Sequence, residues 1–117
     1  MMHEVGLVSD ALSRAIAAAE RSGATRIERM TFAIAGGGHV TPEVVETLCA
    51  ALGAGTLADG ARVACEPLAL DYACFGCGAL FRAADGTCPT CGSPGVAGDD
   101  APELELVSID VTTEGGA

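Results

Sequence analysis

"CFGCGALFRAADGTCPTCG" (residues 74–92) contains four of the six cysteines of the chain, as two C-x-x-C pairs with ten residues between them. The first pair is Cys74 and Cys77, and the second is Cys88 and Cys91. Four thiolates at this spacing complete the tetrahedral coordination of Zn²⁺, because each pair can chelate from a single turn. The stretch therefore predicts a structural zinc site, and a disulfide or redox pair is the alternative. A catalytic zinc is disfavoured because four sulfurs leave no position for water.

Gly78 and Gly92 directly follow the second cysteine of each pair. We expect tight turns there, with backbone N–H groups bonding to the sulfurs. Zinc would then fold a small unit rather than take part in a reaction. A secreted disulfide scaffold is disfavoured because no export signal precedes the cysteines, and acidic Glu4 stands where a signal peptide carries positive charge.

Length and composition set the size of the rest. A chain of 117 residues, half of them hydrophobic, can bury one modest core. Any second unit must be so small that it needs a disulfide or a bound metal for stability. No apolar run approaches the roughly 18 residues that span a bilayer. We expect a soluble cytoplasmic protein without a membrane segment.

The charge balance indicates which kinds of partner this protein can bind. Sixteen acidic residues face six basic ones, and the formal net charge is −10. Proteins that bind nucleic acid normally concentrate positive charge against the phosphates, so nucleic acid is disfavoured as a partner. The acidity serves solubility, and the alternative is attraction of metal cations or of a basic partner protein.

Hydrophobic periodicity outside the cysteine stretch predicts two helices and three strands. Thr41 followed by Pro42 and Glu43 is typical of a helix start. Pro67 indicates an edge or a bend. The phase change near Ile27 indicates a bulge or an earlier start of the strand, and the one within 103–112 indicates a bulge or a change of pairing partner. In chain order the elements are a helix at about 4–22, a strand at about 26–35, a helix at about 42–52, a strand in "ARVACEPLALDYA" (61–73) and a strand in "ELELVSIDVT" (103–112).

Each helix carries one apolar face and needs a sheet to cover. The predicted fold is therefore α+β: a three-stranded sheet with both helices on one face, plus an inserted four-cysteine zinc ribbon. Residues 1–70 form the α/β domain, which strand 103–112 completes, and residues 71–100 form the zinc ribbon. Residues 113–117 are expected to be a disordered tail. The order of the strands in the sheet stays open.

Other candidate residues carry weaker signals. Cys49 and Cys65 are expected to be small buried hydrophobic residues, with a reactive thiol as the alternative. His39 lies in "AGGGHV", which has neither P-loop nor dinucleotide-binding spacing, and we expect a solvated loop residue there. His3 is either an exposed or capping side chain or, together with nearby backbone nitrogens, half of a nickel or copper site.

Four segments resemble the HypA/HybF family in the same order along the chain: "MHEVGLVSDAL" (2–12), "GTLADGARV" (55–63), the two C-x-x-C-G knuckles and "ELELVSIDV" (103–111). The resemblance implies a nickel metallochaperone whose Ni²⁺ site is Met2, His3 and Glu4. It also implies a structural Zn²⁺ at the four cysteines. The implied partners are a HypB-like GTPase and the large subunit of [NiFe]-hydrogenase.

The chain departs from the family pattern in two places. Family members commonly have Gly-Glu after the first strand and Asp before the second helix, where this chain has Ala35-Gly36 and Thr41. We therefore carry no carboxylate from that loop over to the nickel site. The second departure is Met1, ahead of the motif, and we expect the physiological chain to begin at Met2.

The residues and the resemblance together predict a nickel carrier and not an enzyme, since no set of base, nucleophile and oxyanion donor is recognisable. The N-terminal site would bind Ni²⁺ and release it for hydrogenase maturation, while the zinc site would stay closed. The alternative is a zinc-ribbon protein-interaction module with no nickel role, in which His3 is incidental.

Overall fold

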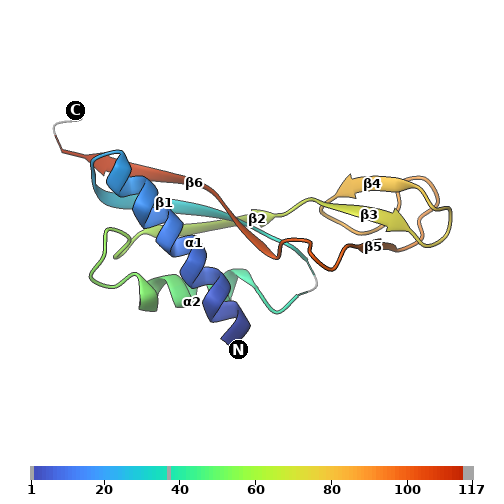
Figure 1. The fold of residues 1–117 in the computed structure, drawn as a ribbon, viewed down its shortest axis with the longest axis horizontal. Helices are drawn as coiled ribbons and strands as arrows, with labels where there is room; N and C mark the ends of the chain where they lie inside the picture. Colours follow the sequence, from blue (N-terminus) through green and yellow to red (C-terminus); the bar gives the residue numbers. More distant parts are fainter. Residues whose placement is uncertain (1, 37, 115–117) are drawn as a thin grey trace.

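The computed structural model describes residues 2–36 and 38–114 and consists of two units along a length of 56 Å (Figure 1). Its two helices and two three-stranded sheets confirm the predicted α+β class. The elements are α1 (Met2–Arg21), β1 (Ala24–Ile34), α2 (Pro42–Leu52), β2 (Arg62–Pro67), β3 (Leu70–Cys74), β4 (Leu80–Ala83), β5 (Gly95–Ala97) and β6 (Leu104–Thr113).

Strand β1 is the centre of the larger sheet, whose order is β2-β1-β6. It pairs in parallel with β2 and antiparallel with β6. Ile27, Met30 and Phe32 of β1 are fully buried in one core together with residues of both helices. Both helices therefore cover the same face of the sheet, as the sequence predicts.

The two helices begin and pack as their sequences require. The side chain of Thr41 accepts a hydrogen bond from the N–H of Val44 at 3.2 Å, and Pro42 occupies the first turn of α2. This is the expected N-cap, which satisfies one of the N–H groups that have no partner inside a helix. Helix α1 begins at Met2, two residues before the predicted start. Its apolar stripe is buried at Val8, Leu12, Ala15 and Ala19.

The phase change predicted in the last strand is a bulge at Val107. Thr31 pairs with Ser108 and Phe32 pairs with Leu106, so Val107 is skipped in the ladder and is exposed. The extra residue reverses the phase of the strand. Residues on both sides of it therefore face the same core: Leu104, Leu106, Ile109 and Val111.

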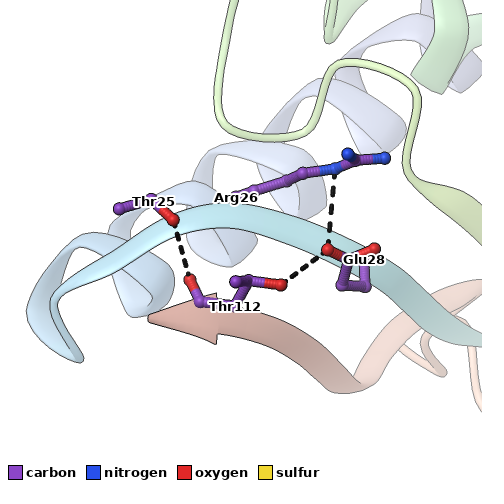
Figure 2. A network of polar contacts seen from close by, with 4 residues as sticks. All are labelled: Thr25, Arg26, Glu28 and Thr112. Carbon is purple, nitrogen blue, oxygen red and sulfur yellow. Dashed lines mark hydrogen bonds and ion pairs between the residues drawn. The ribbon is translucent and has the colours of Figure 1, made fainter. Parts of the chain in front are cut away.

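Polar contacts tie the beginning of β1 to the end of β6 (Figure 2). The hydroxyl of Thr25 donates to the carbonyl of Thr112 at 3.2 Å, and the hydroxyl of Thr112 donates to Glu28 at 2.6 Å. Arg26 lies 3.7 Å from the same carboxylate. Strand β6 thus continues through Thr113, so the predicted tail at 113–117 begins too early. Residues 115–117 lie outside the described residues.

The predicted strand at 61–73 is wrong as a single element, because it divides at Pro67 into β2 and β3, which belong to different sheets. Proline is tolerated on the edge strand β2, and the chain leaves the larger sheet only after the N–H of Leu68 has donated to the carbonyl of Ile34 at 2.9 Å. The smaller sheet, of order β4-β3-β5, was not predicted. It forms a unit inserted between β2 and β6, here called the cysteine module (residues 70–97).

Among residues 2–36 and 38–114, no helix has the length and apolar character needed to cross a membrane.

Phe32 tests the position of the core. Because its side chain is fully buried, Phe32→Ala should lower the free energy of unfolding by about 3–5 kcal/mol. Urea denaturation followed by circular dichroism measures the change. Val107→Ala is the control, since half of that side chain is exposed and its loss should change stability by less than about 0.5 kcal/mol. Equal losses in both variants would contradict the described packing.

Candidate metal centres

The cysteine module brings its four cysteines together at one end. Cys74 ends β3, Cys77 follows in the turn, and Cys88 and Cys91 lie between β4 and β5. One ligand atom from each lies within 4.8 Å of all the others. The Sγ atoms of Cys74 and Cys91 are 3.4 Å apart, and those of Cys77 and Cys88 are 3.8 Å apart. The predicted metal ligands therefore converge.

Each C-x-x-C pair is shaped by a turn that ends on glycine. Gly78 and Gly92 have φ angles of 75° and 77°, which L side chains rarely adopt. Their N–H groups donate to the carbonyls of Cys74 and Cys88, at 3.1 and 2.9 Å, and not to sulfur. The donors to sulfur come one and two residues before Gly78, where the N–H groups of Gly76 and Cys77 approach the Sγ of Cys74 at 3.3 and 3.4 Å. The expected tight turns are present, and different N–H groups face the sulfur.

Local hydrogen bonds also favour thiolates at the second pair. The side chain and then the N–H of Ser93 lower the pKa of Cys91 to about 6. The N–H of Cys91 lowers the pKa of Cys88. Since the thiolate is the form that binds metals, these hydrogen bonds favour metal binding by Cys88 and Cys91.

The donor set fits Zn²⁺. Sulfurs bound tetrahedrally at about 2.3 Å lie about 3.8 Å apart. The Sγ atoms of Cys77 and Cys88 are at that distance, and those of Cys74 and Cys91 are slightly closer, at 3.4 Å. Four sulfurs fill the coordination sphere and leave no site for a substrate. The unit around them has little apolar core: Tyr72 stacks on Phe81 with ring centroids 5.3 Å apart, while Phe75 and Leu80 are exposed. A metal at this cluster would therefore supply much of the stability of the module.

The site around His3 differs from the cysteine cluster because its side chain is largely exposed. His3 is on the first turn of α1, its side chain is 63% exposed, and its Nε2 lies 2.5 Å from the Oε2 of Glu103. The hydrogen bond to Glu103, and then the charge of that carboxylate, raise the pKa of His3 above 6.5. The structure thus gives the imidazole a carboxylate partner 100 residues away in sequence.

The other N-terminal candidates, Met2 and Glu4, are the neighbours of His3 in the first turn of α1. Glu4 is buried and lines a groove of about 520 Å³ together with His39 and Glu43. Met2 belongs to α1, and Met1 lies outside the described residues. Within residues 2–36 and 38–114, the four cysteines are the only group of three or more potential ligands that already converge.

Glu103 is the residue of this region that sequence reasoning missed. It precedes β6 and begins the segment 103–111 that resembles the family, but that segment was read only as a strand, and the pairing of β6 with β1 brings Glu103 to α1. Cys49 lies in the main core, where burial raises its pKa to about 11, and burial also raises the pKa of Cys65. Both raised pKa values favour the protonated thiol at neutral pH. Cys49 is buried as predicted, whereas Cys65 is only partly buried.

Comparison with known proteins identifies the family to which this chain is similar. A family model described as "Hydrogenase/urease nickel incorporation, metallochaperone, hypA" matches residues 2–111. The chain is 34% identical to a hydrogenase maturation factor HypA of Picosynechococcus sp. (strain ATCC 27264 / PCC 7002 / PR-6) and 32% identical to one of Geobacter sulfurreducens (strain ATCC 51573 / DSM 12127 / PCA). Each match covers 94% of this chain and 99% of the relative.

The fold is also shared with solved structures. The solution structure of the Ni metallochaperone HypA from Helicobacter pylori matches with a TM-score of 0.66 and 18% identity, over 94% of this chain and 97% of that one. A helix–sheet domain with an inserted four-thiolate unit defines a small metal-binding protein. The chain belongs to the HypA family, which confirms the resemblance seen in the sequence.

The thiolate cluster yields a test of the module. Cys74→Ser and Cys91→Ser should lose zinc and unfold residues of about 72–95, because a structural metal supplies most of the folding free energy of so small a unit. Elemental analysis measures the zinc, and amide NMR spectra report the module. Cys65→Ser is the control and should keep its zinc. Loss of the signals of α1 as well would show that the two units do not fold separately.

The His3–Glu103 pair yields a pH prediction. Since the folded protein has the higher pKa, the pair contributes to stability at pH below about 6.5, and this contribution is lost as the pH rises through the raised pKa. An NMR titration of His3 should show a midpoint above 6.5 that falls in Glu103→Gln. Glu105→Gln removes an equal charge two residues away and should leave the midpoint raised. A midpoint unaffected by Glu103→Gln would contradict the pair.

Proposed function

We propose that this protein binds Ni²⁺ through Met2, His3 and Glu4 and delivers it for the maturation of [NiFe]-hydrogenase. The observation that carries the proposal is the exposed imidazole of His3 on the first turn of α1. A carrier must bind its cargo and also release it. An accessible nitrogen-donor site serves that purpose, whereas a closed four-thiolate site does not.

The backbone at this position adds suitable donors. The first four N–H groups of an α-helix have no partner within the helix. Because α1 begins at Met2, the amide of His3 is among them and can be deprotonated without breaking a helical hydrogen bond. An amide nitrogen and an imidazole from one residue are donors that square-planar Ni²⁺ prefers. Glu4 would complete the ligand set after a rearrangement of its side chain.

We assign the four cysteines to a structural Zn²⁺ that stays in place while nickel comes and goes. The proposed partners are a HypB-like GTPase and the large subunit of [NiFe]-hydrogenase. Family membership supports a place in hydrogenase maturation, and the formal charge of −10 favours partners with basic surfaces. A carrier of this kind is not an enzyme, and its thiolate site belongs in the reducing cytoplasm.

A second candidate function is a zinc-ribbon interaction module without a nickel role. The exposed side chains of Phe75 and Leu80, at 75% and 83%, favour it, because exposed large apolar residues often mark protein contacts. The two candidates differ in what they require of His3, which only the nickel carrier needs.

Nickel titration separates these functions. His3→Ala should weaken nickel binding by more than about tenfold, or about 1.4 kcal/mol, because it removes the imidazole donor. Isothermal titration calorimetry of zinc-loaded protein measures the affinity. His39→Ala is the matched control, since it removes the second of the two histidines and should leave the affinity unchanged. Equal affinities for wild type and His3→Ala would leave only the interaction module.

A further inference from the structure

We infer that Glu103 is a positioning residue of the nickel site: it holds the proton of His3 on Nε2 and so leaves Nδ1 to bind the metal. The inference rests on the proposed function, and it adds a residue from the segment between the cysteine module and β6. Its evidence is the contact of 2.5 Å between His3 Nε2 and Glu103 Oε2.

The chemistry of the pair fixes the direction of the hydrogen bond. An ionised carboxylate can only accept, so Nε2 of His3 must donate. In a neutral imidazole one ring nitrogen carries the proton and the other carries the lone pair. The Glu103 contact therefore leaves the lone pair on Nδ1. Carboxylates that bind the second N–H of a ligand histidine fix its tautomer and raise its basicity.

Nδ1 is also the nitrogen that suits a backbone chelate. It is attached to the ring carbon that bears Cβ, so a metal bound to Nδ1 and to the amide nitrogen of His3 closes a ring of six atoms. Binding through Nε2 would need a larger ring and would displace Glu103. The tautomer that Glu103 selects is thus the one in which amide and imidazole can act together on one metal ion.

Glu103 is held by the sheet and not by the cysteine module alone. Its carbonyl accepts the N–H of Ala35 at 3.0 Å, and the next residue, Leu104, pairs with Ile34. His3 belongs to α1, which packs on the same sheet through Val8. His3 therefore starts from a helix, and Glu103 is held by its bond to Ala35 directly before β6, as a positioning contact requires, although both side chains are partly exposed.

The experiment compares Glu103→Ala, Glu103→Gln and Glu105→Ala in full-length zinc-loaded protein. Glu105 lies exposed on β6 and serves as the control for lost charge. Glu103→Ala should weaken nickel binding by about 10- to 100-fold, as expected when a ligand histidine loses its carboxylate. Glu103→Gln should retain more of the affinity, because the amide oxygen still accepts from Nε2–H. Glu105→Ala should bind like wild type.

Three measurements test whether Glu103 acts through His3. NMR should show a slowly exchanging Nε2–H proton of His3 in wild type and Glu103→Gln, and none in Glu103→Ala. Nickel X-ray absorption should show the same number of donors in wild type and Glu103→Gln. In a His3→Ala background, Glu103→Ala should have no further effect on affinity.

The possible failures are distinguishable. If wild type and His3→Ala bind nickel equally, the proposed function fails. If His3 is required but Glu103→Ala binds as tightly as wild type, the positioning role is wrong while the function stands. Loss of an oxygen donor from the absorption spectrum of Glu103→Gln would make Glu103 a direct ligand and would also overturn the inference.

Discussion

The pairing of β1 on both of its edges is the constraint on which the rest of the structure depends. Its parallel neighbour β2 and its antiparallel neighbour β6 lead into and out of the cysteine module. At the end of β1, the carbonyl of Ile34 accepts from Leu68 and the N–H of Ala35 donates to Glu103. The same strand supplies Phe32 to the core beneath both helices. One strand thus fixes the helices, the module and the carboxylate that faces His3.

The two candidate metal centres differ in the way that a permanent and a transient site should differ. The cysteine cluster places four soft donors close together, with Cys74 and Cys88 buried and Cys77 and Cys91 exposed, and four thiolates would complete the coordination of a tetrahedral metal. His3 offers a nitrogen donor at the surface, at the first turn of a helix, with one carboxylate behind it. In the proposed function, a receiving protein would approach His3 and replace the nickel ligands one at a time, whereas four thiolates would leave no open coordination position for an incoming ligand.

Local chemistry made much of this structure predictable. The helix start at Thr41 follows from its side chain and from Pro42, and the thiolate cluster follows from C-x-x-C spacing, because each signal acts over a few residues. Pro67 was predicted as an edge or a bend, but the second sheet was not predicted, because a proline constrains its own position and not where the chain goes next. The contact of Glu103 with His3 could not be predicted, because it depends on strand pairing across the whole chain.

The cysteine module is attached to the larger sheet by two stretches of chain instead of one. Leu68 lies on the incoming stretch and Ala101 on the outgoing one, and both pack in a small cluster with Ala33 of β1. A unit held by two neighbouring tethers can tilt by small backbone changes in both, but twisting it about the long axis would wind the tethers around each other. The module should therefore tilt about the two connecting stretches rather than twist, and the outgoing stretch leads directly to Glu103.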